Sequence, residues 1–408
     1  MSTHCALWLA APDLQLPLSM LLVFGSAKLL AELLERLNQP AIVGEILAGV
    51  LLGPSVLGWV APNEFLSALA NLGAMFLLFG VGLEVKSREL LRVGGTATLV
   101  ATLGVVAPFF LGWGILLLWG ASQIESIFVG ATMVATSVGI TARVLSSHGL
   151  LQERSSKIIL AAAVIDDVQG LLVLALVSSF AKGKVAVLEL TLTAALAIGF
   201  TVVVAVWGAR TMGKMVPRLQ AGLRAQEAEF FLAMVVLFAA SLLAVWVGVA
   251  AIVGAFLAGM ALSESVGRRV HDMAHGVTEL LVPFFLAGIG LHVNLGMFRD
   301  PSITLLTAVI LVAAILSKFV GCGLGAASLG RADAIRIGLG MMPRGEVGMV
   351  AAQLGLAMGT ISQNVYGVVV FMAVATTLIA PPCLNLAYRA ILTARRQEDR
   401  QAQRPPGP

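Results

Sequence analysis

The sequence predicts an all-α polytopic membrane protein with about 13 transmembrane helices. Three observations support this fold class. Of the 408 residues, 59% are apolar and only 12% are charged, about half the charged share of a soluble domain. The mean hydropathy is +0.96. Apolar stretches of about 20 residues, the length that crosses the hydrocarbon core of a bilayer, recur along the chain.

Thirteen apolar segments account for most of the chain, and short connections separate them. The predicted helices cover residues 15–36, 41–60, 65–83, 95–119, 124–147, 156–181, 186–208, 228–247, 249–264, 276–294, 303–328, 332–358 and 365–391. Residues 1–392 are therefore expected to form a single transmembrane unit. The polar residues 393–408 are expected to form a disordered cytoplasmic tail.

The positive charges give this set of helices an orientation. With the N-terminus outside, 19 of the 26 Lys and Arg fall in cytoplasmic segments, and only Lys182, Lys184 and Arg299 fall outside. Cytoplasmic loops of membrane proteins are enriched in Lys and Arg. The sequence therefore predicts an external N-terminus and a cytoplasmic C-terminus.

The chain also contains an internal repeat. Residues 41–52 (AIVGEILAGVLL) match residues 251–262 (AIVGAFLAGMAL) at eight of 12 positions, and residues 76–85 match residues 284–293 at six of ten. In both matches, the second copy lies seven predicted helices after the first. Because seven is odd, the copies cross the membrane in opposite directions, so helices 1–6 and 8–13 form an inverted repeat. Such repeats are typical of secondary transporters.

Two equivalent segments of this repeat are predicted to interrupt their helices. Residues 136–141 (TSVGIT) are polar within an apolar span, and residues 343–348 (PRGEVG) lie 207 positions later. Pro343 lacks a backbone donor, and glycine weakens a helix. Broken helices at membrane depth are tolerated where they line a cavity.

Three charged residues are expected to lie deep in the membrane. Asp166 and Asp167 are about ten residues into their helix, roughly 15 Å from its start. A carboxylate at this depth is costly and usually functional. Lys318, in the eleventh predicted helix, is the expected partner of one of them.

These residues suggest a site at which a cation and a proton compete. Burial and repulsion between like charges favour the protonated form of a carboxylate. Such a group can hold either a proton or a small hard cation, and this competition is sufficient for exchange. Thr136, Ser137 and carbonyls of the broken helix are expected to complete the shell. Arg344 and Glu346 are expected to support it, either by pairing with each other or by neutralising half-helix ends.

Other charged residues are assigned lesser roles. Lys28 and Glu32 are four residues apart and are expected to pair along one helix. Glu45 is expected to lie near a helix end, where it is solvated or paired. Arg143 follows the first predicted break and is expected to pair with a nearby acid.

Several protein classes are excluded. The three cysteines are widely separated and the histidines show no HExxH spacing, so neither a disulfide framework nor a zinc site is predicted, and no cofactor is expected. Nucleic-acid binding is not expected, because no basic run with interleaved aromatic residues is present. An intramembrane aspartyl protease would need two Asp on separate helices, whereas Asp166 and Asp167 lie on the same predicted helix. No enzyme activity is therefore expected.

Four segments carry a resemblance to a known family. NQPAIVGEILAGVLLGP, ATSVGITARVL, AAVIDDV and GMMPRGEVG resemble segments of the bacterial NapA-type sodium/proton antiporters of the monovalent cation:proton antiporter superfamily. The resemblance extends from about Leu37 to Pro381. It implies crossed broken helices, and dimerisation and core subdomains that are interleaved in the sequence. It also implies that Asp167 binds Na⁺ (or Li⁺) and protons, and that Asp166 pairs with Lys318.

The resemblance further implies how and where the protein works. It implies electrogenic exchange of two protons for one sodium ion by an elevator-type movement, in a homodimer embedded in the lipids of the bacterial inner (plasma) membrane. A potassium/proton antiporter of the same superfamily and a sodium-coupled symporter remain alternatives. A channel is disfavoured, because a fixed Lys at the site would oppose cation flow.

Overall fold

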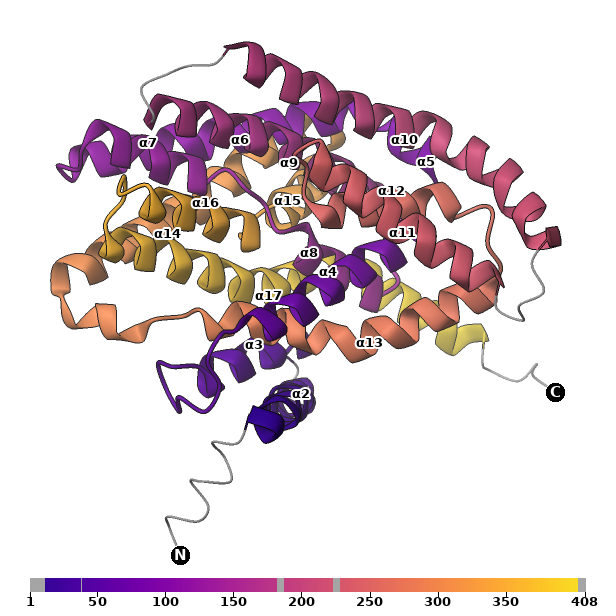
Figure 1. The fold of residues 1–408 in the computed structure, drawn as a ribbon, viewed down its shortest axis with the longest axis horizontal. Coiled ribbons are helices and arrows are strands. Elements are labelled where there is room, and N and C mark those ends of the chain that lie inside the picture. The colour runs from indigo at the N-terminus through magenta and orange to yellow at the C-terminus, as the bar shows by residue number, and fades with distance from the viewer. Residues whose placement is uncertain (1–11, 38, 182–186, 223–227, 403–408) are drawn as a thin grey trace, which may run out of the picture.

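The computed structural model describes residues 12–37, 39–181, 187–222 and 228–402. Helices and short connections make up these ranges, with no strand among them. Most helices run roughly along the long axis of the molecule (Figure 1). They are α2 (Pro12–Arg36), α3 (Ala41–Leu52), α4 (Glu64–Glu84), α5 (Ser87–Arg92), α6 (Gly94–Leu118), α7 (Gln123–Thr132), α8 (Val138–Ser147), α9 (Arg154–Ala181), α10 (Val187–Gly222), α11 (Ala228–Trp246), α12 (Ala251–Leu262), α13 (Arg268–Leu291), α14 (Pro301–Gly325), α15 (Arg331–Gly340), α16 (Glu346–Ala357) and α17 (Gln363–Ala402), with 3₁₀ turns η1 (Leu295–Arg299) and η2 (Ala327–Leu329).

The prediction of an all-α polytopic membrane protein is confirmed. Within the described ranges, nine helices are long and apolar enough to cross a membrane, and α3, α12 and part of α16 are shorter apolar helices. The predicted span 41–60 is wrong at its end, because α3 stops at Leu52. Gly53 there is extended (φ −66°, ψ 172°) and precedes Pro54, which disfavours the helical conformation of the residue before it. The number of membrane crossings stays a prediction.

The two halves of the repeat have matching elements. α3 and α12 each contain 12 residues, and both follow a residue with nearly the same extended conformation, Pro40 (φ −61°, ψ 134°) and Ala250 (φ −61°, ψ 140°). α7 and α15 each contain ten residues and each ends in a five-residue interruption. The sequence similarity therefore extends to local backbone geometry.

Close helix contacts also occur in equivalent pairs. Gly49 of α3 lies so close to the carbonyl of Ala287 in α13 that a Cβ atom at Gly49 would collide with it. Gly259 of α12 has the equivalent contact with the carbonyl of Phe79 in α4. Gly49 and Gly259 are 210 residues apart, and Ala287 and Phe79 are 208 residues apart, which are the offsets of the repeat. Exchanging the two halves therefore reproduces the contact. Small residues permit this approach of helix backbones.

Packing divides most of the helices into two groups. α2, α3, α4, α11, α12 and α13 pack mainly against one another, and we call them the α4 bundle. α6–α9 and α14–α17 also pack mainly among themselves, and we call them the α6 bundle. α10 lies along one edge of the molecule (Figure 1) and contacts both α9 and α12.

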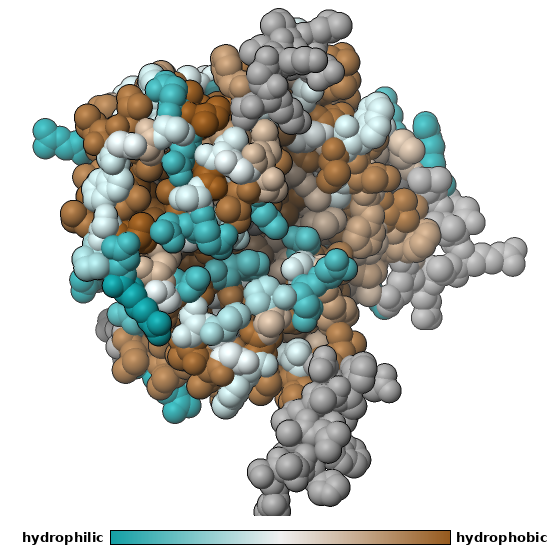
Figure 2. All heavy atoms as spheres, turned by 60° about the vertical axis from the view of Figure 1, so that its left-hand side comes forward, coloured by the Kyte–Doolittle hydropathy of each residue, from teal (hydrophilic) through white to brown (hydrophobic). Residues whose placement is uncertain are grey.

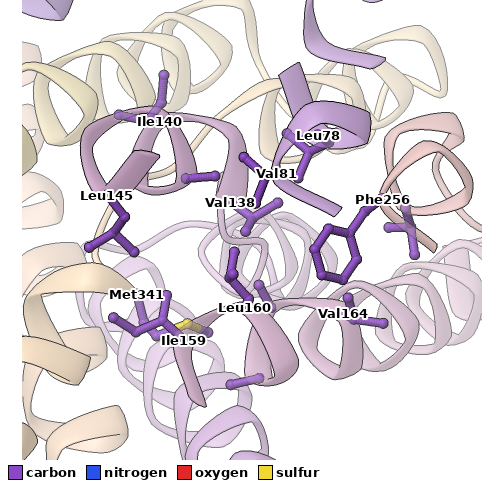
Figure 3. Packing of buried hydrophobic residues seen from close by; sticks show 14 of the residues in the cluster. Leu78, Val81, Val138, Ile140, Leu145, Ile159, Leu160, Val164, Phe256 and Met341 are labelled. Atoms are coloured by element: carbon purple, nitrogen blue, oxygen red, sulfur yellow. The ribbon is translucent and has the colours of Figure 1, made fainter. Parts of the chain in front are cut away.

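An apolar seam lies between the bundles. Leu78 of α4 and Phe256 of α12 face Val138 of α8 and Val164 of α9 (Figure 3). All four side chains are buried. Because this contact is apolar, it is not tied to one register by directional hydrogen bonds.

The surface and the C-terminal end show two further features. Figure 2 shows one face of the molecule, on which hydrophilic side chains gather across the middle and hydrophobic side chains lie on either side. α17 continues to Ala402, so residues 393–402 of the predicted disordered tail are helical. These residues lack Gly and Pro and consist mainly of Ala, Arg, Gln and Glu, which favour helix. Residues 403–408 of that tail lie outside the described residues.

The predicted pair between Lys28 and Glu32 is wrong. Lys28 Nζ instead lies 3.1 Å from Glu45 Oε1 and 3.5 Å from Glu279 Oε2, while Glu32 pairs with Arg36 at 2.9 Å. Glu45, which we expected to be either solvated or paired near a helix end, is only 3% exposed and is paired. Lys28 thus partners a buried carboxylate of another helix, and this relieves the cost of burying that charge.

Candidate functional site

The two predicted helix breaks lie at one place in the structure and cross. α7 ends at Thr132 and α8 begins at Val138, whereas α15 ends at Gly340 and α16 begins at Glu346. The backbone N–H of Ser137 donates to the carbonyl of Pro343 at 2.9 Å. The breaks therefore span residues 133–137 and 341–345, and begin earlier in the chain than predicted. Residues 138–141 and 346–348 already form the first turns of α8 and α16.

A glycine permits the two breaks to approach each other. A Cβ atom at Gly345 would lie 2.5 Å from both Cβ and Oγ of Ser137. Thr141 Oγ1 adds a hydrogen bond of 2.6 Å to the carbonyl of Gly340. The crossing therefore depends on a missing side chain in one break and on hydrogen bonds from the other.

Asp166 and Lys318 form a fully buried ion pair beside the crossing. Lys318 Nζ lies 2.7 Å from Asp166 Oδ1, and both side chains have no exposed area. The other carboxylate oxygen, Oδ2, accepts a hydrogen bond from the backbone N–H of Thr136 at 3.1 Å. Protein groups therefore engage both oxygens of Asp166, and the carboxylate holds the first break in place.

Lys318 also satisfies backbone carbonyls that the helices leave without a donor. Its ammonium donates to the carbonyl of Gly104 at 2.7 Å and to that of Val134 at 2.8 Å. In α6, the residue four positions after Gly104 is Pro108, which has no N–H to bond that carbonyl. Val134 lies in the interruption after α7, where the helical hydrogen bonds stop.

Arg344 lies in the second break and reaches the end of the first half-helix. Its side chain is fully buried. It donates to the carbonyls of Val134 at 3.1 Å and Ala135 at 3.2 Å, and to that of Ala314 at 3.2 Å. The C-terminal end of a helix carries partial negative charge. Of the two roles considered from the sequence, this geometry corresponds to neutralising a half-helix end.

Two threonines of α17 fix the backbone at Arg344. Thr376 Oγ1 accepts a hydrogen bond from the Arg344 N–H at 3.1 Å, and Thr377 Oγ1 donates to the Arg344 carbonyl at 2.6 Å. Sequence reasoning did not identify these threonines. The sequence does contain a sign of their role: Thr376 and Thr377 are two adjacent hydroxyl side chains within the apolar span that follows the PRGEVG segment.

Asp167 faces the apolar seam between the bundles. It lines a cavity of about 10 Å³ together with residues of α4, α8, α9 and α12: Leu78, Val138, Leu160, Val164, Ile252, Val253 and Phe256. Because Asp166 and Asp167 are neighbours on one helix, their side chains point about 100° apart. The structure accordingly directs Asp166 toward Lys318 and Asp167 toward the α4 bundle.

Two further predicted site residues contribute hydroxyl groups. Thr136 Oγ1 and Ser137 Oγ are buried and have no hydrogen-bond partner among the residues that the structure describes. Buried polar groups are normally satisfied, so these oxygens are available to a ligand. The backbone of Glu346 begins α16, but its side chain lies outside the described part of the chain.

Cavities lie along α4 on either side of the Asp167 cavity. The larger one, about 470 Å³, lies toward Leu66, is mostly apolar and includes Ile252, which also borders the Asp167 cavity. The smaller one, about 60 Å³, lies toward Glu84 and is lined by Arg143, Ser146 and two histidines. We call these two ends of α4 the Leu66 end and the Glu84 end. The seam closes the Asp167 cavity between them.

The comparison with family models decides what kind of protein this is. Residues 20–387 match the model described as sodium/hydrogen exchanger, transmembrane. The chain belongs to this family. It is therefore a multi-pass membrane transporter and not an enzyme, and its predicted membership of the monovalent cation:proton antiporter superfamily is confirmed.

Individual relatives and solved structures agree with this family. The chain is 32% identical over 380 residues to the Na⁺/H⁺-K⁺ antiporter GerN of Bacillus cereus, covering 90% of this chain and 95% of that protein. It is 31% identical to the high-affinity Na⁺/H⁺ antiporter NhaS3 of Synechocystis, covering 91% and 89%. The sodium proton antiporter MjNhaP1 of Methanocaldococcus jannaschii aligns with a TM-score of 0.63 at 17% identity, covering 91% of this chain and 96% of that one. MjNhaP1 therefore shares the fold.

Proposed function

We propose that this member of the family exchanges Na⁺ or Li⁺ for protons, and that the Asp167 carboxylate is the group that holds one or the other. The observation that carries this proposal is the position of Asp167. It lines the cavity at the seam where α9 of the α6 bundle meets α4 and α12 of the α4 bundle, while the neighbouring Asp166 pairs with Lys318 and the Thr136 N–H inside the α6 bundle.

The surroundings of Asp167 support a cation site. The Thr136 and Ser137 hydroxyls belong to the break that Asp166 holds, one position along α9 from Asp167. Oxygens of unwound helix segments coordinate ions in transporters. One carboxylate with neutral oxygens suits a monovalent ion. Lys318 and Arg344 fix the site and do not bind the cation.

Alternating access to this site is proposed to occur by an elevator-type movement of the α6 bundle against the α4 bundle. The grouping of helix contacts supports this movement. The apolar seam supports it as well, because sliding along such a surface breaks few directional bonds. In this proposal the α6 bundle is the core subdomain, and the α4 bundle forms the dimerisation subdomain of a homodimer.

The choice of ion and the charge balance complete the proposal. Na⁺ is the first choice, since GerN and NhaS3 both carry Na⁺/H⁺ in their names. K⁺ is the second candidate, because the name of GerN also includes K⁺. We further propose that exchange is electrogenic, and that the protein lies in a bacterial inner membrane with its N-terminus outside and its C-terminus cytoplasmic.

Proton flux in everted membrane vesicles tests the proposal. A fluorescent dye reports the pH gradient while NaCl, LiCl or KCl is added over a series of pH values. The wild-type protein is expected to dissipate the gradient on addition of Na⁺ or Li⁺, and Asp167→Asn is expected to abolish the response. Asp272→Asn serves as the control, because it removes an exposed carboxylate of α13 and is expected to leave the flux unchanged.

The alternatives give different results in the same assay. A response to K⁺ alone would move the protein to potassium/proton exchange at the same site. Full activity of a well-expressed Asp167→Asn variant would refute the site. A rate in proteoliposomes that does not change with imposed membrane potential would refute electrogenic exchange.

A further inference from the structure

An ion pair joins the two bundles at the Glu84 end. Arg143 belongs to α8 of the α6 bundle, and Glu279 belongs to α13 of the α4 bundle. Arg143 Nη2 lies 2.6 Å from Glu279 Oε1. The Arg143 side chain is 16% exposed and that of Glu279 is 39% exposed, so water screens the pair only in part. The pair can form only while α8 lies beside α13.

The α4 bundle provides an acidic position for Arg143. Glu279 and the buried Glu45 share one lysine, Lys28, at 3.5 and 3.1 Å. These three side chains all belong to the α4 bundle and together carry one excess negative charge. Arg143 from the other bundle balances that charge, so its withdrawal would leave Glu279 with the longer contact to Lys28 as its ion pair among the residues that the structure describes.

Another polar contact between the bundles lies at the same end. The Gln152 side-chain amide, in the loop before α9, donates to the Glu84 carbonyl at the end of α4, at 2.6 Å. At the opposite end a cavity of about 470 Å³ lies toward Leu66. At the Glu84 end Arg143 lies between a cavity of about 60 Å³ along α4 and one of about 410 Å³ beside α3 that Glu45 also lines. Polar contacts thus join the bundles at the Glu84 end, and the ion pair of Arg143 spans the space between the two cavities there.

We propose that Arg143 and Glu279 form an ionic latch that stabilises the state closed at the Glu84 end and so sets how often the ion site opens there. This inference rests on the alternating-access part of the proposed function. Opening the Glu84 end moves α8 away from α13 and breaks the pair. Neutralising either partner removes this contribution from the closed state alone, because the separated charges are hydrated in the open state. The open state is therefore more populated in such a variant.

Thiol labelling at both ends tests the latch without measuring transport. In a background with Cys5, Cys322 and Cys383 replaced by Ser, a single cysteine is introduced either at Ser146, in the small cavity, or at Ala74, in the large one. Both positions line their cavities. The protein is placed in nanodiscs, which expose both ends, and the rate of reaction with a polar maleimide is measured.

Glu279→Gln is expected to raise the labelling rate of Ser146→Cys by roughly fivefold, at the lower end of typical couplings between two states, and to lower the rate of Ala74→Cys. Glu32→Gln is the matched control. It breaks an ion pair with Arg36 of 2.9 Å that lies within α2, so both labelling rates should stay unchanged.

A double variant shows whether the two residues act as a pair. Arg143→Gln alone, Glu279→Gln alone and both together are expected to give the same change, because each breaks the one pair that joins α8 to α13. The further contact of Glu279 with Lys28 lies within the α4 bundle and is the same in both states. Multiplied effects in the double variant would refute the latch. An unchanged Ser146→Cys rate would also refute it, as would a faster Ser146→Cys rate with no change at Ala74→Cys, which indicates local loosening. The antiport assay of Asp167→Asn fails or succeeds independently of these rates.

Discussion

Replacing Lys318 by Met tests the role of the buried ion pair in most detail. The substitution keeps a long side chain but removes the ammonium that donates to Asp166, Gly104 and Val134 at 2.7, 2.7 and 2.8 Å. Removing one partner of a buried pair costs about 3–5 kcal/mol. Val134 keeps a hydrogen bond from Arg344, whereas Gly104 has no helical donor because of Pro108. We therefore expect Lys318→Met to lower the free energy of unfolding by about 3–5 kcal/mol.

The double variant Asp166→Asn/Lys318→Met separates this pair from its surroundings. With both charges removed, no isolated charge remains buried, so the loss should be smaller than that of Lys318→Met alone. We expect a coupling free energy of about 2–3 kcal/mol between the two positions, in the range for residues in contact. A loss in the double variant equal to the sum of the single losses would refute the argument.

The measurement is equilibrium unfolding in mixed detergent micelles, followed by tryptophan fluorescence. Lys157→Met is the matched control, since Lys157 pairs with Glu89 at 2.8 Å while both side chains are partly exposed (17% and 31%). Partly exposed pairs contribute about 0–1 kcal/mol. A loss of this size for Lys318→Met would show that the buried pair does not stabilise the fold as proposed.

Two further substitutions test the crossing of the broken helices. Gly345→Ala should destabilise the protein by about 1–3 kcal/mol through overpacking against Ser137 and should slow cation-dependent proton flux. The control Gly25→Ala, whose added Cβ atom meets no neighbouring atom within 4 Å, should not slow the flux. Equal flux in the two variants would contradict the account. Thr377→Val removes the hydroxyl that donates to the Arg344 carbonyl and should cost about 1–3 kcal/mol in unfolding free energy; a value near zero would show that the carbonyl finds another donor.

Much of the architecture could be predicted because it follows from hydrophobicity and repetition. Apolar length identified the helical segments, and the offset of the repeat located two equivalent breaks. Lys318 was recognisable as the partner of one of the two aspartates because a buried charge needs an opposite charge, and the family resemblance assigned it to Asp166. The breaks themselves were placed a few residues late. A polar or Gly-containing turn is compatible with the first turn of a half-helix, and local sequence does not specify which side of that turn is unwound.

Other features depend on contacts between distant segments and could not be predicted. Lys28 has Glu32 four residues away, yet it pairs with Glu45 and Glu279. Packing of α2 against α3 and α13 places it beside these acids instead. Likewise, no local signal shows that Arg344 reaches the carbonyls after α7. That contact exists only because the two breaks cross.

The most direct test of the central claim measures proton release on ion binding, without transport. Purified protein in weakly buffered detergent solution is mixed with NaCl, and released protons are recorded with a pH dye over a series of starting pH values. The account predicts that wild-type protein releases protons when Na⁺ is added and that Asp167→Asn releases none, because the carboxylate that Na⁺ and the proton share is absent. Undiminished proton release from a folded Asp167→Asn variant would contradict the claim that Asp167 is the shared site.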